Sequence, residues 1–159
     1  MYNLTKIGLD EKKAKKVAKK LNELLANYQV FYINIRGFHW NIKGKAFFEL
    51  HIKFEELYED SFVKIDEIAE RILTIGHQPL HSYTDYLKQA KVKEIKNVSD
   101  GVEALKEILK AYEVIIPIER ELLKITEECD DEGTNALMSD YIKEQEKLVW
   151  MYAAYLANE

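Results

Sequence analysis

The stretch FHWNIKGKAFFELHIKFEELYEDSFVKIDEIAERILTIG, residues 38–76, decides how this chain folds. From about Lys45 to Ile75 it reads as one long helix. Gly76 supplies a natural C-cap for that helix, and Pro79 prevents it from continuing. Before the helix, the segment Asn41-Ile42-Lys43-Gly44 breaks the pattern and is expected to be a loop.

Three further long helices and one short helix are predicted outside this stretch. The first covers about residues 10–38, with Asp10 as its N-cap. The third covers 99–128 and contains Pro117, which should kink it or disturb one turn. The fourth covers roughly 134–157, and residues 82–90 form a short helix between the second and third. The broad apolar face of the first helix consists of Val17, Leu21, Leu24, Leu25, Tyr28, Phe31 and Tyr32.

Composition agrees with an all-α protein. A length of 159 residues suits one domain, and a hydrophobic fraction of 47% is enough to form a core. Two prolines and six glycines are too few for a sandwich or barrel with many tight turns. Because the loops are short except for one long connection, we expect residues 1–159 to form a single four-helix bundle, with 1–9 as a short N-terminal extension.

Charge and cysteine content restrict the partners and the compartment. The net charge of −5 shows that the chain as a whole is not built to neutralise phosphates. No apolar run approaches the roughly 18 residues of a membrane span, and the N-terminus lacks the apolar region of a secretory signal. The single cysteine, Cys129, cannot form an internal disulfide. We therefore expect a cytoplasmic protein with no membrane partner.

Four ionisable residues of the second helix point to one side. At 100° per residue, His51, Glu55, Asp66 and Glu70 fall within an arc of about 100°, which they share with aromatic and aliphatic residues. Ionisable groups in such surroundings are costly to bury unless they are paired or bound to a cation. Carboxylates combined with one or two imidazoles suit iron. The pattern therefore predicts a metal site.

A single copy of this helix cannot gather the four side chains around one metal, because Glu55 and Asp66 are about 16 Å apart along the axis. However, Glu55 and Asp66 are equally far from the midpoint between residues 60 and 61, and so are His51 and Glu70. Two antiparallel copies related by a two-fold axis at that midpoint would place His51 and Glu55 opposite the partner's Asp66 and Glu70. The sequence thus predicts a site shared between two subunits.

His39 adds a second imidazole to this prediction. It lies at the end of the first helix, and the chain reversal that follows can bring it beside His51. An in-bundle di-iron site uses Glu-x-x-His on two helices, but no histidine of this chain has Glu three residues before it. An in-bundle site is therefore not expected. His77 and His81 border a turn and are expected at the surface.

The same stretch resembles the Dps proteins (DNA-binding proteins from starved cells), or miniferritins, of the ferritin-like superfamily. The resemblance rests on the His39-Trp40 pair, on the Gly44-x-x-Phe-Phe run, and on the spacing of the predicted ligands. The C-terminal stretch EKLVWMYAAYL, which contains Trp150, is also similar, so the resemblance covers about residues 10–157. It implies a ferritin-like four-helix bundle whose copies form a hollow dodecamer. Such a cage oxidises Fe(II) with hydrogen peroxide or dioxygen, stores the ferric mineral, and protects against oxidative stress.

Carried over by position, the resemblance implies that His39, His51, Asp66 and Glu70 are ferroxidase ligands for iron. Position 55 departs from the commoner family pattern, which has Asp. Glu55 keeps the charge and extends the carboxylate by one methylene, so its mode of coordination stays open. Trp40, beside the first histidine, would lie close to the iron and intercept radicals.

Two alternatives compete with iron oxidation. Lysine pairs at 12–13, 15–16 and 19–20 form a basic face that, repeated twelve times, could bind DNA, so the rival function is a nucleoid-type DNA-compacting protein with little iron chemistry. DNA is the less favoured partner, because only Lys6 precedes the first helix where DNA-binding members carry a longer basic tail. The same ligands would also accept manganese or zinc. Acids near the fourth helix either line a cation entry pore or are simply solvated: Asp130, Asp131, Asp140, Glu144 and Glu146.

Overall fold

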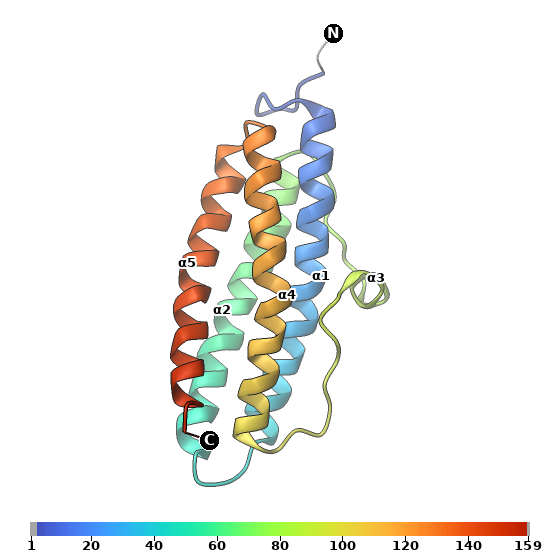
Figure 1. Cartoon of the computed structure of the whole chain (residues 1–159). Coiled ribbons are helices and arrows are strands. Elements are labelled where there is room, and N and C mark those ends of the chain that lie inside the picture. The colour runs from blue at the N-terminus through green and yellow to red at the C-terminus, as the bar shows by residue number, and fades with distance from the viewer. Residues whose placement is uncertain (1–2, 159) are drawn as a thin grey trace.

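The structure, a computed structural model, describes residues 3–158, and within that range it contains five α-helices and no strand (Figure 1). The first two residues of the predicted N-terminal extension therefore lie outside the described residues. The prediction of an all-α bundle with a short helix in the long crossover is confirmed. The helices are α1 (Glu11–Asn41), α2 (Phe47–Thr74), α3 (Tyr83–Gln89), α4 (Gly101–Glu128) and α5 (Glu132–Tyr155).

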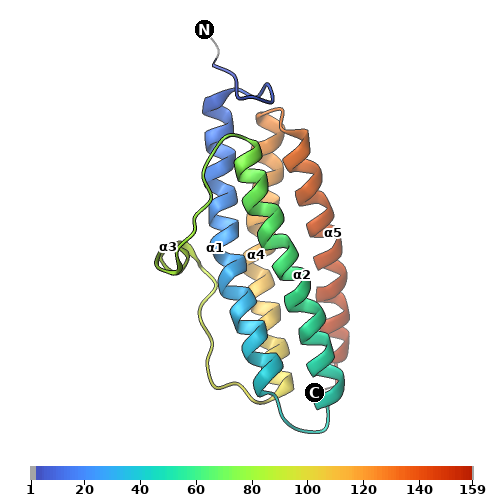
Figure 2. The ribbon, with the colours of Figure 1, turned by 180° about the vertical axis from the view of Figure 1, so that it is seen from behind.

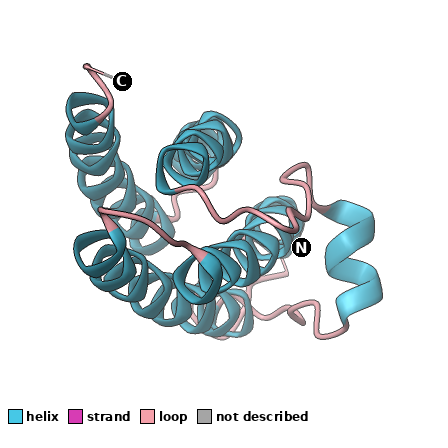
Figure 3. Ribbon diagram, turned by 90° about the horizontal axis from the view of Figure 1, so that it is seen from below, coloured by secondary structure: helices cyan, strands magenta, loops and turns pink. Residues whose placement is uncertain are grey.

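The four long helices run side by side as two antiparallel pairs, α1 with α2 and α4 with α5 (Figures 1 and 2). After α2, the chain returns along the whole bundle before α4 begins, and this crossover carries α3. Seen from below, α3 stands outside the four-helix core, next to α1 (Figure 3). None of the helices within residues 3–158 has both the length and the apolar character needed to cross a membrane.

Aspartate side chains start three of the long helices. Asp10 accepts a hydrogen bond from the backbone N–H of Lys13 at 3.0 Å, which confirms the predicted N-cap of α1. Asp100 and Asp131 accept the corresponding bonds for α4 and α5, at 2.8 and 3.0 Å. The fourth long helix consequently begins at Glu132 and ends at Tyr155, two residues earlier at each end than the predicted 134–157.

The first helix is longer than predicted, because it continues to Asn41 instead of ending near residue 38. The chain leaves the helix at the C-cap Ile42, whose backbone is extended, and it then turns at Gly44, where a φ of 108° favours glycine. The N–H of Ile42 still bonds to the carbonyl of Phe38 at 3.1 Å. After α2, Gly76 follows the C-cap Ile75 and has a φ of 91°, as expected of the glycine that ends a helix. Pro117 does not end or split α4.

Asparagines of α1 fasten the crossover to the bundle. The side-chain oxygen of Asn27 accepts hydrogen bonds from the backbone N–H groups of residues 91 and 92, both at 2.9 Å. Asn34 accepts from the N–H of Ile95 at 3.0 Å and donates to the carbonyl of Lys93 at 2.8 Å. Because buried backbone polar groups need partners, these side chains replace the secondary structure that the crossover lacks.

The core contains one polar layer that the sequence did not predict. Most of the predicted apolar face of α1 is buried, but Tyr28 shares its layer with Glu119 of α4 and Gln145 of α5. Glu119 Oε1 accepts hydrogen bonds from the Tyr28 hydroxyl at 2.9 Å and from Gln145 Nε2 at 3.0 Å. Burial raises the pKa of Glu119 to about 8 although Lys64 and Arg120 oppose the shift. The carboxyl therefore holds its proton to a higher pH than an exposed glutamate does.

Candidate metal centre

His39 and His51 lie face to face where the end of α1 meets the start of α2. Their ring centroids are 3.8 Å apart and the rings are inclined by only 11°. Nδ1 of His39 lies 2.7 Å from the backbone oxygen of His51, and Nδ1 of His51 lies 2.8 Å from the backbone oxygen of His39. The extension of α1 to Asn41 places His39 on the helix and so makes this reciprocal arrangement possible.

These two hydrogen bonds determine the tautomer of both rings. A carbonyl oxygen only accepts, so Nδ1 must carry the proton in His39 and in His51. In this tautomer Nε2 carries the free lone pair, and this is the form in which histidine binds a metal. The backbone thus orients both imidazoles before any ligand arrives.

Aromatic rings hold the histidine pair in place. Phe47 stacks on the His51 ring at 4.9 Å, and Tyr58 meets the His39 ring edge-on at 5.2 Å. His39 is buried, with 7% of its surface exposed, while His51 is half-buried. The His39 ring is therefore held inside the protein, while part of the His51 ring is accessible from outside.

Glu55 belongs to the same cluster through Tyr58, whose hydroxyl donates to Glu55 Oε1 in a long hydrogen bond of 3.5 Å. Desolvation raises the pKa of the Tyr58 phenol, and the carboxylates of Glu55 and Glu59 raise it further. The phenol therefore keeps its proton at neutral pH. Tyr58 and Phe47 were not predicted as site residues, because a tyrosine or phenylalanine at helical spacing looks like any other core residue.

Asp66 and Glu70 do not join this cluster within the subunit. Both are exposed on α2, more than two helical turns beyond Glu55. Among residues 3–158, no group of three or more His, Cys, Asp and Glu side chains is close enough to hold a metal ion. One chain thus presents two separated halves of the predicted ligand set, and their union across a two-fold axis stays a prediction.

The side of α2 that carries the predicted ligands also exposes large apolar residues. Phe48 is 79% exposed and Leu73 is 58% exposed. These two residues are equally far from the midpoint between residues 60 and 61, like the ligand pairs. An antiparallel copy of α2 would set each Phe48 against the partner's Leu73 and cover both. Phe48 and Leu73 therefore have the same spacing about this midpoint as the predicted ligands.

Trp40 points away from the core, with 57% of its surface exposed. The guanidinium of Arg36, one turn earlier on α1, lies 4.7 Å from the centroid of the Trp40 ring. Arg36 also covers the rings of Tyr32 and Tyr58, at 5.5 and 5.4 Å. One cation thus contacts three oxidisable rings beside the histidine pair.

Half of the lysines on the predicted basic face are already ion-paired. Lys13 contacts Asp130 at 3.3 Å and Lys16 contacts Glu128 at 2.8 Å. Lys20 pairs with glutamates of α1 and α4. Charges neutralised in this way add little to phosphate binding. The basic face therefore offers less unpaired positive charge to DNA than the sequence suggested.

Four of the five acids considered for a cation pore also have partners inside the subunit. Glu144 bonds to Lys64 at 2.8 Å, and Asp131 bonds to Arg71 at 2.7 Å. The other two paired acids, Asp130 and Glu146, contact Lys13 and Arg120. These ion pairs reduce the negative charge available to attract Fe(II).

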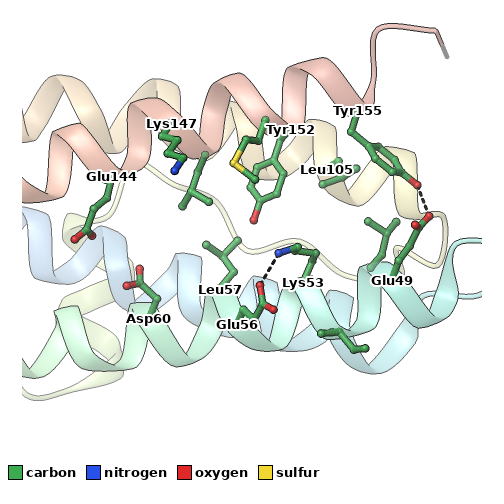
Figure 4. Close-up of a pocket in the computed structure, with 14 residues that line it drawn as sticks. Glu49, Lys53, Glu56, Leu57, Asp60, Leu105, Glu144, Lys147, Tyr152 and Tyr155 are labelled. Atoms are coloured by element: carbon green, nitrogen blue, oxygen red, sulfur yellow. Dashed lines mark hydrogen bonds and ion pairs between the residues drawn. The ribbon is translucent and has the colours of Figure 1, made fainter.

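A cavity of about 720 Å³ opens between α2 and α5, away from the histidine pair (Figure 4). Leu57, Leu105 and Tyr152 form part of its mainly apolar lining. Its carboxylates are engaged: Lys53 bonds to Glu56 at 2.8 Å, and other acids on its rim bond to Lys64 and Tyr155. This cavity is therefore not the candidate iron site.

Comparison with known proteins agrees with this geometry. Residues 18–159 match the family model described as the ferritin-like domain. This chain, a four-helix bundle with histidines and carboxylates at the end of α1 and along α2, thus belongs to the ferritin-like class. The chain is 53% identical to an uncharacterized protein of Haemophilus influenzae, with 94% of each chain covered. It is 45% identical to a DNA protection during starvation protein of Porphyromonas gingivalis, with 93% of each covered.

Solved structures narrow the class further. The crystal structure of a Dps protein from Vibrio cholerae O1, described as a member of a broad superfamily of ferritin-like diiron-carboxylate proteins, superposes with a TM-score of 0.96 at 53% identity and covers 98% of both chains. A Dps structure from Bacillus brevis gives 0.88 at 34% identity, covering 91% of this chain and 97% of that one. The chain therefore belongs to the Dps family.

Proposed function

We propose that this protein is a miniferritin subunit that oxidises Fe(II) with hydrogen peroxide at a site shared by two copies, and that a dodecameric cage of the subunits stores the ferric product. The reciprocal histidine pair carries this proposal. Two imidazoles whose Nδ1 atoms each donate to the other residue's backbone carbonyl leave Nε2 to bind a metal, and they would supply half of the proposed site.

The other half would come from the partner's Asp66 and Glu70. Both carboxylates are exposed on the ligand-bearing side of α2, and the helix holds them too far from His51 to act within one subunit. The matching exposure of Phe48 and Leu73 supports the same antiparallel pairing, because large apolar patches on a soluble protein mark interaction surfaces.

The expected chemistry follows from the ligand types. Carboxylates stabilise Fe(III) more than Fe(II), so the mixed carboxylate and imidazole set favours loss of an electron from the substrate iron. Two Fe(II) ions supply the two electrons that peroxide needs, and hydroxyl radical is then not released. Oxidation would thus deliver ferric iron to the mineral and remove peroxide, which gives the protein its protective role.

The proposal is tested with a double variant, His39→Ala with His51→Ala. Assembly should persist, because the exposed apolar residues Phe48 and Leu73 of the predicted interface are unchanged, while oxidation of Fe(II) by peroxide should slow strongly. The matched control is His81→Ala, an exposed histidine of the crossover. Stopped-flow absorbance of ferric product gives the rate, and an unchanged rate in the assembled double variant would exclude these histidines from the site.

A further inference from the structure

The cavity of about 720 Å³ lies between α2 and α5, whose backbones do not approach each other as closely as those of α1 and α2 or of α4 and α5. Three buried leucines from α2 and α4 form its floor: Leu50, Leu57 and Leu105. Three residues of α5 form one of its walls: Leu148, Met151 and Tyr152. An apolar ligand that covered this surface would remove it from water, which is favourable.

Two polar bridges between α2 and α5 bound the cavity along its length (Figure 4). At one end, the ammonium group of Lys64 bonds to Asp60 of its own helix at 2.7 Å and to Glu144 of α5 at 2.8 Å. At the other end, the Tyr155 hydroxyl donates to Glu49 at 2.9 Å. Between residues 49 and 60, α2 rises about 16 Å. The cavity is therefore short and closed at both ends.

This shape suits a small elongated molecule better than a helix of another protein chain. The volume falls within the roughly 300–1,000 Å³ that is usual for small-molecule sites. A helix with its side chains is about 10 Å wide and needs a groove that is open at its ends. Here such a helix would meet the Lys64 bridge at one end and the Tyr155 bridge at the other.

The charged residues around the cavity select the head group of the ligand. Glu56 bonds to Lys53 at 2.8 Å, and the acids of the two bridges also have donors. Lys147 of α5 is exposed, and within residues 3–158 no hydrogen bond or ion pair engages its ammonium group. Figure 4 shows this side chain extending from α5 toward α2. An anionic head group thus finds an unpaired cation, whereas a cationic one finds only carboxylates that already have donors.

We infer that this cavity binds a medium-chain fatty acid, with the carboxylate at Lys147 and the acyl chain along the leucine floor toward Tyr155. From residue 147 to residue 155, α5 rises about 12 Å, a length that an extended acyl chain of this class spans. The site is separate from the histidine pair, and none of the predicted iron ligands lines it. The inference therefore goes beyond the proposed function and does not depend on it.

The experiment is isothermal titration calorimetry of the full-length, assembled protein at neutral pH, where the fatty acid is ionised. Octanoate, decanoate and dodecanoate are titrated below their micelle concentrations. Affinity should rise about fourfold for each added methylene, because each one removes further apolar surface from water. Dodecyltrimethylammonium, which has the same chain and a cationic head, should bind more weakly than dodecanoate.

Variants of α5 then locate the site. Lys147→Gln should weaken decanoate binding by about fivefold, the effect of an exposed ion pair, and should leave the binding of decanol unchanged. The matched control is Lys143→Gln, an exposed lysine one turn earlier that does not line the cavity. Met151→Trp puts a larger side chain into the cavity and should abolish the binding of all three acids.

Three results would overturn the inference: no binding of any acid by the wild type, an affinity that does not increase with chain length, or tighter binding of the cationic amphiphile. The first would show that another copy of the chain covers the cavity in the assembly. Because these results are read in the wild type, the test does not depend on the folding of a variant. Iron oxidation measured on the same preparation tests the proposed function separately.

Discussion

Replacing Glu119 with Gln should stabilise the protein at alkaline pH. The carboxyl is fully buried between Tyr28 and Gln145, and burial raises its pKa from 4.5 to about 8. Between these two values the unfolded chain has released a proton that the native chain still holds. The free energy of unfolding therefore falls as pH rises through this window, by about 1.4 kcal/mol per unit, or on the order of 5 kcal/mol in all.

Glu119→Gln removes this loss, because a neutral amide oxygen can accept the same two hydrogen bonds. Thermal unfolding followed from pH 5 to pH 9 should show similar midpoints for both proteins at pH 5. At pH 9 the variant should be higher by roughly 10–20 °C, taking about 2–4 °C per kcal/mol for a chain of this size. Glu113→Gln, an exposed residue of the same helix, should leave the profile unchanged. Parallel pH profiles for wild type and Glu119→Gln would refute the reasoning.

Three further substitutions test the fold and the predicted assembly. Asn27→Leu deprives the N–H groups of residues 91–92 of their acceptor and should cost about 2–4 kcal/mol, with faster hydrogen exchange in that segment; unchanged exchange would contradict this role. Arg71→Leu leaves the buried Asp131 carboxylate without its cation and should cost about 3–5 kcal/mol in chemical denaturation. Phe48→Asp should reduce the mass measured by light scattering, whereas an intact oligomer would place Phe48 outside the interface.

Much of the fold could be predicted because its signals are local. Asp10 and Gly76 mark helix ends through their own chemistry, and both predictions were confirmed. The predicted helix end near residue 38 was too early, because residues 39–41 are still helical and the chain leaves the helix only at the extended Ile42.

The polar contacts could not be predicted in the same way, because each one joins residues far apart in the sequence. Glu119 looks like an ordinary helix-surface acid until α1 and α5 bring Tyr28 and Gln145 against it. The histidine pair was partly predictable, since a short chain reversal separates His39 from His51. The two hydrogen bonds from each imidazole to the other residue's carbonyl could not be predicted, because they depend on where the folded backbone places those carbonyls.

Mixed assemblies of two inactive variants would test the shared site most directly. One variant carries His39→Ala and His51→Ala, and the other carries Asp66→Ala and Glu70→Ala. In a random equal mixture, half of the two-fold pairs contain one copy of each variant, and every such pair regains one intact site of two. Iron oxidation should then recover to about one quarter of the wild-type rate. A mixture that assembles fully and stays as inactive as its parents would contradict a site built from two subunits.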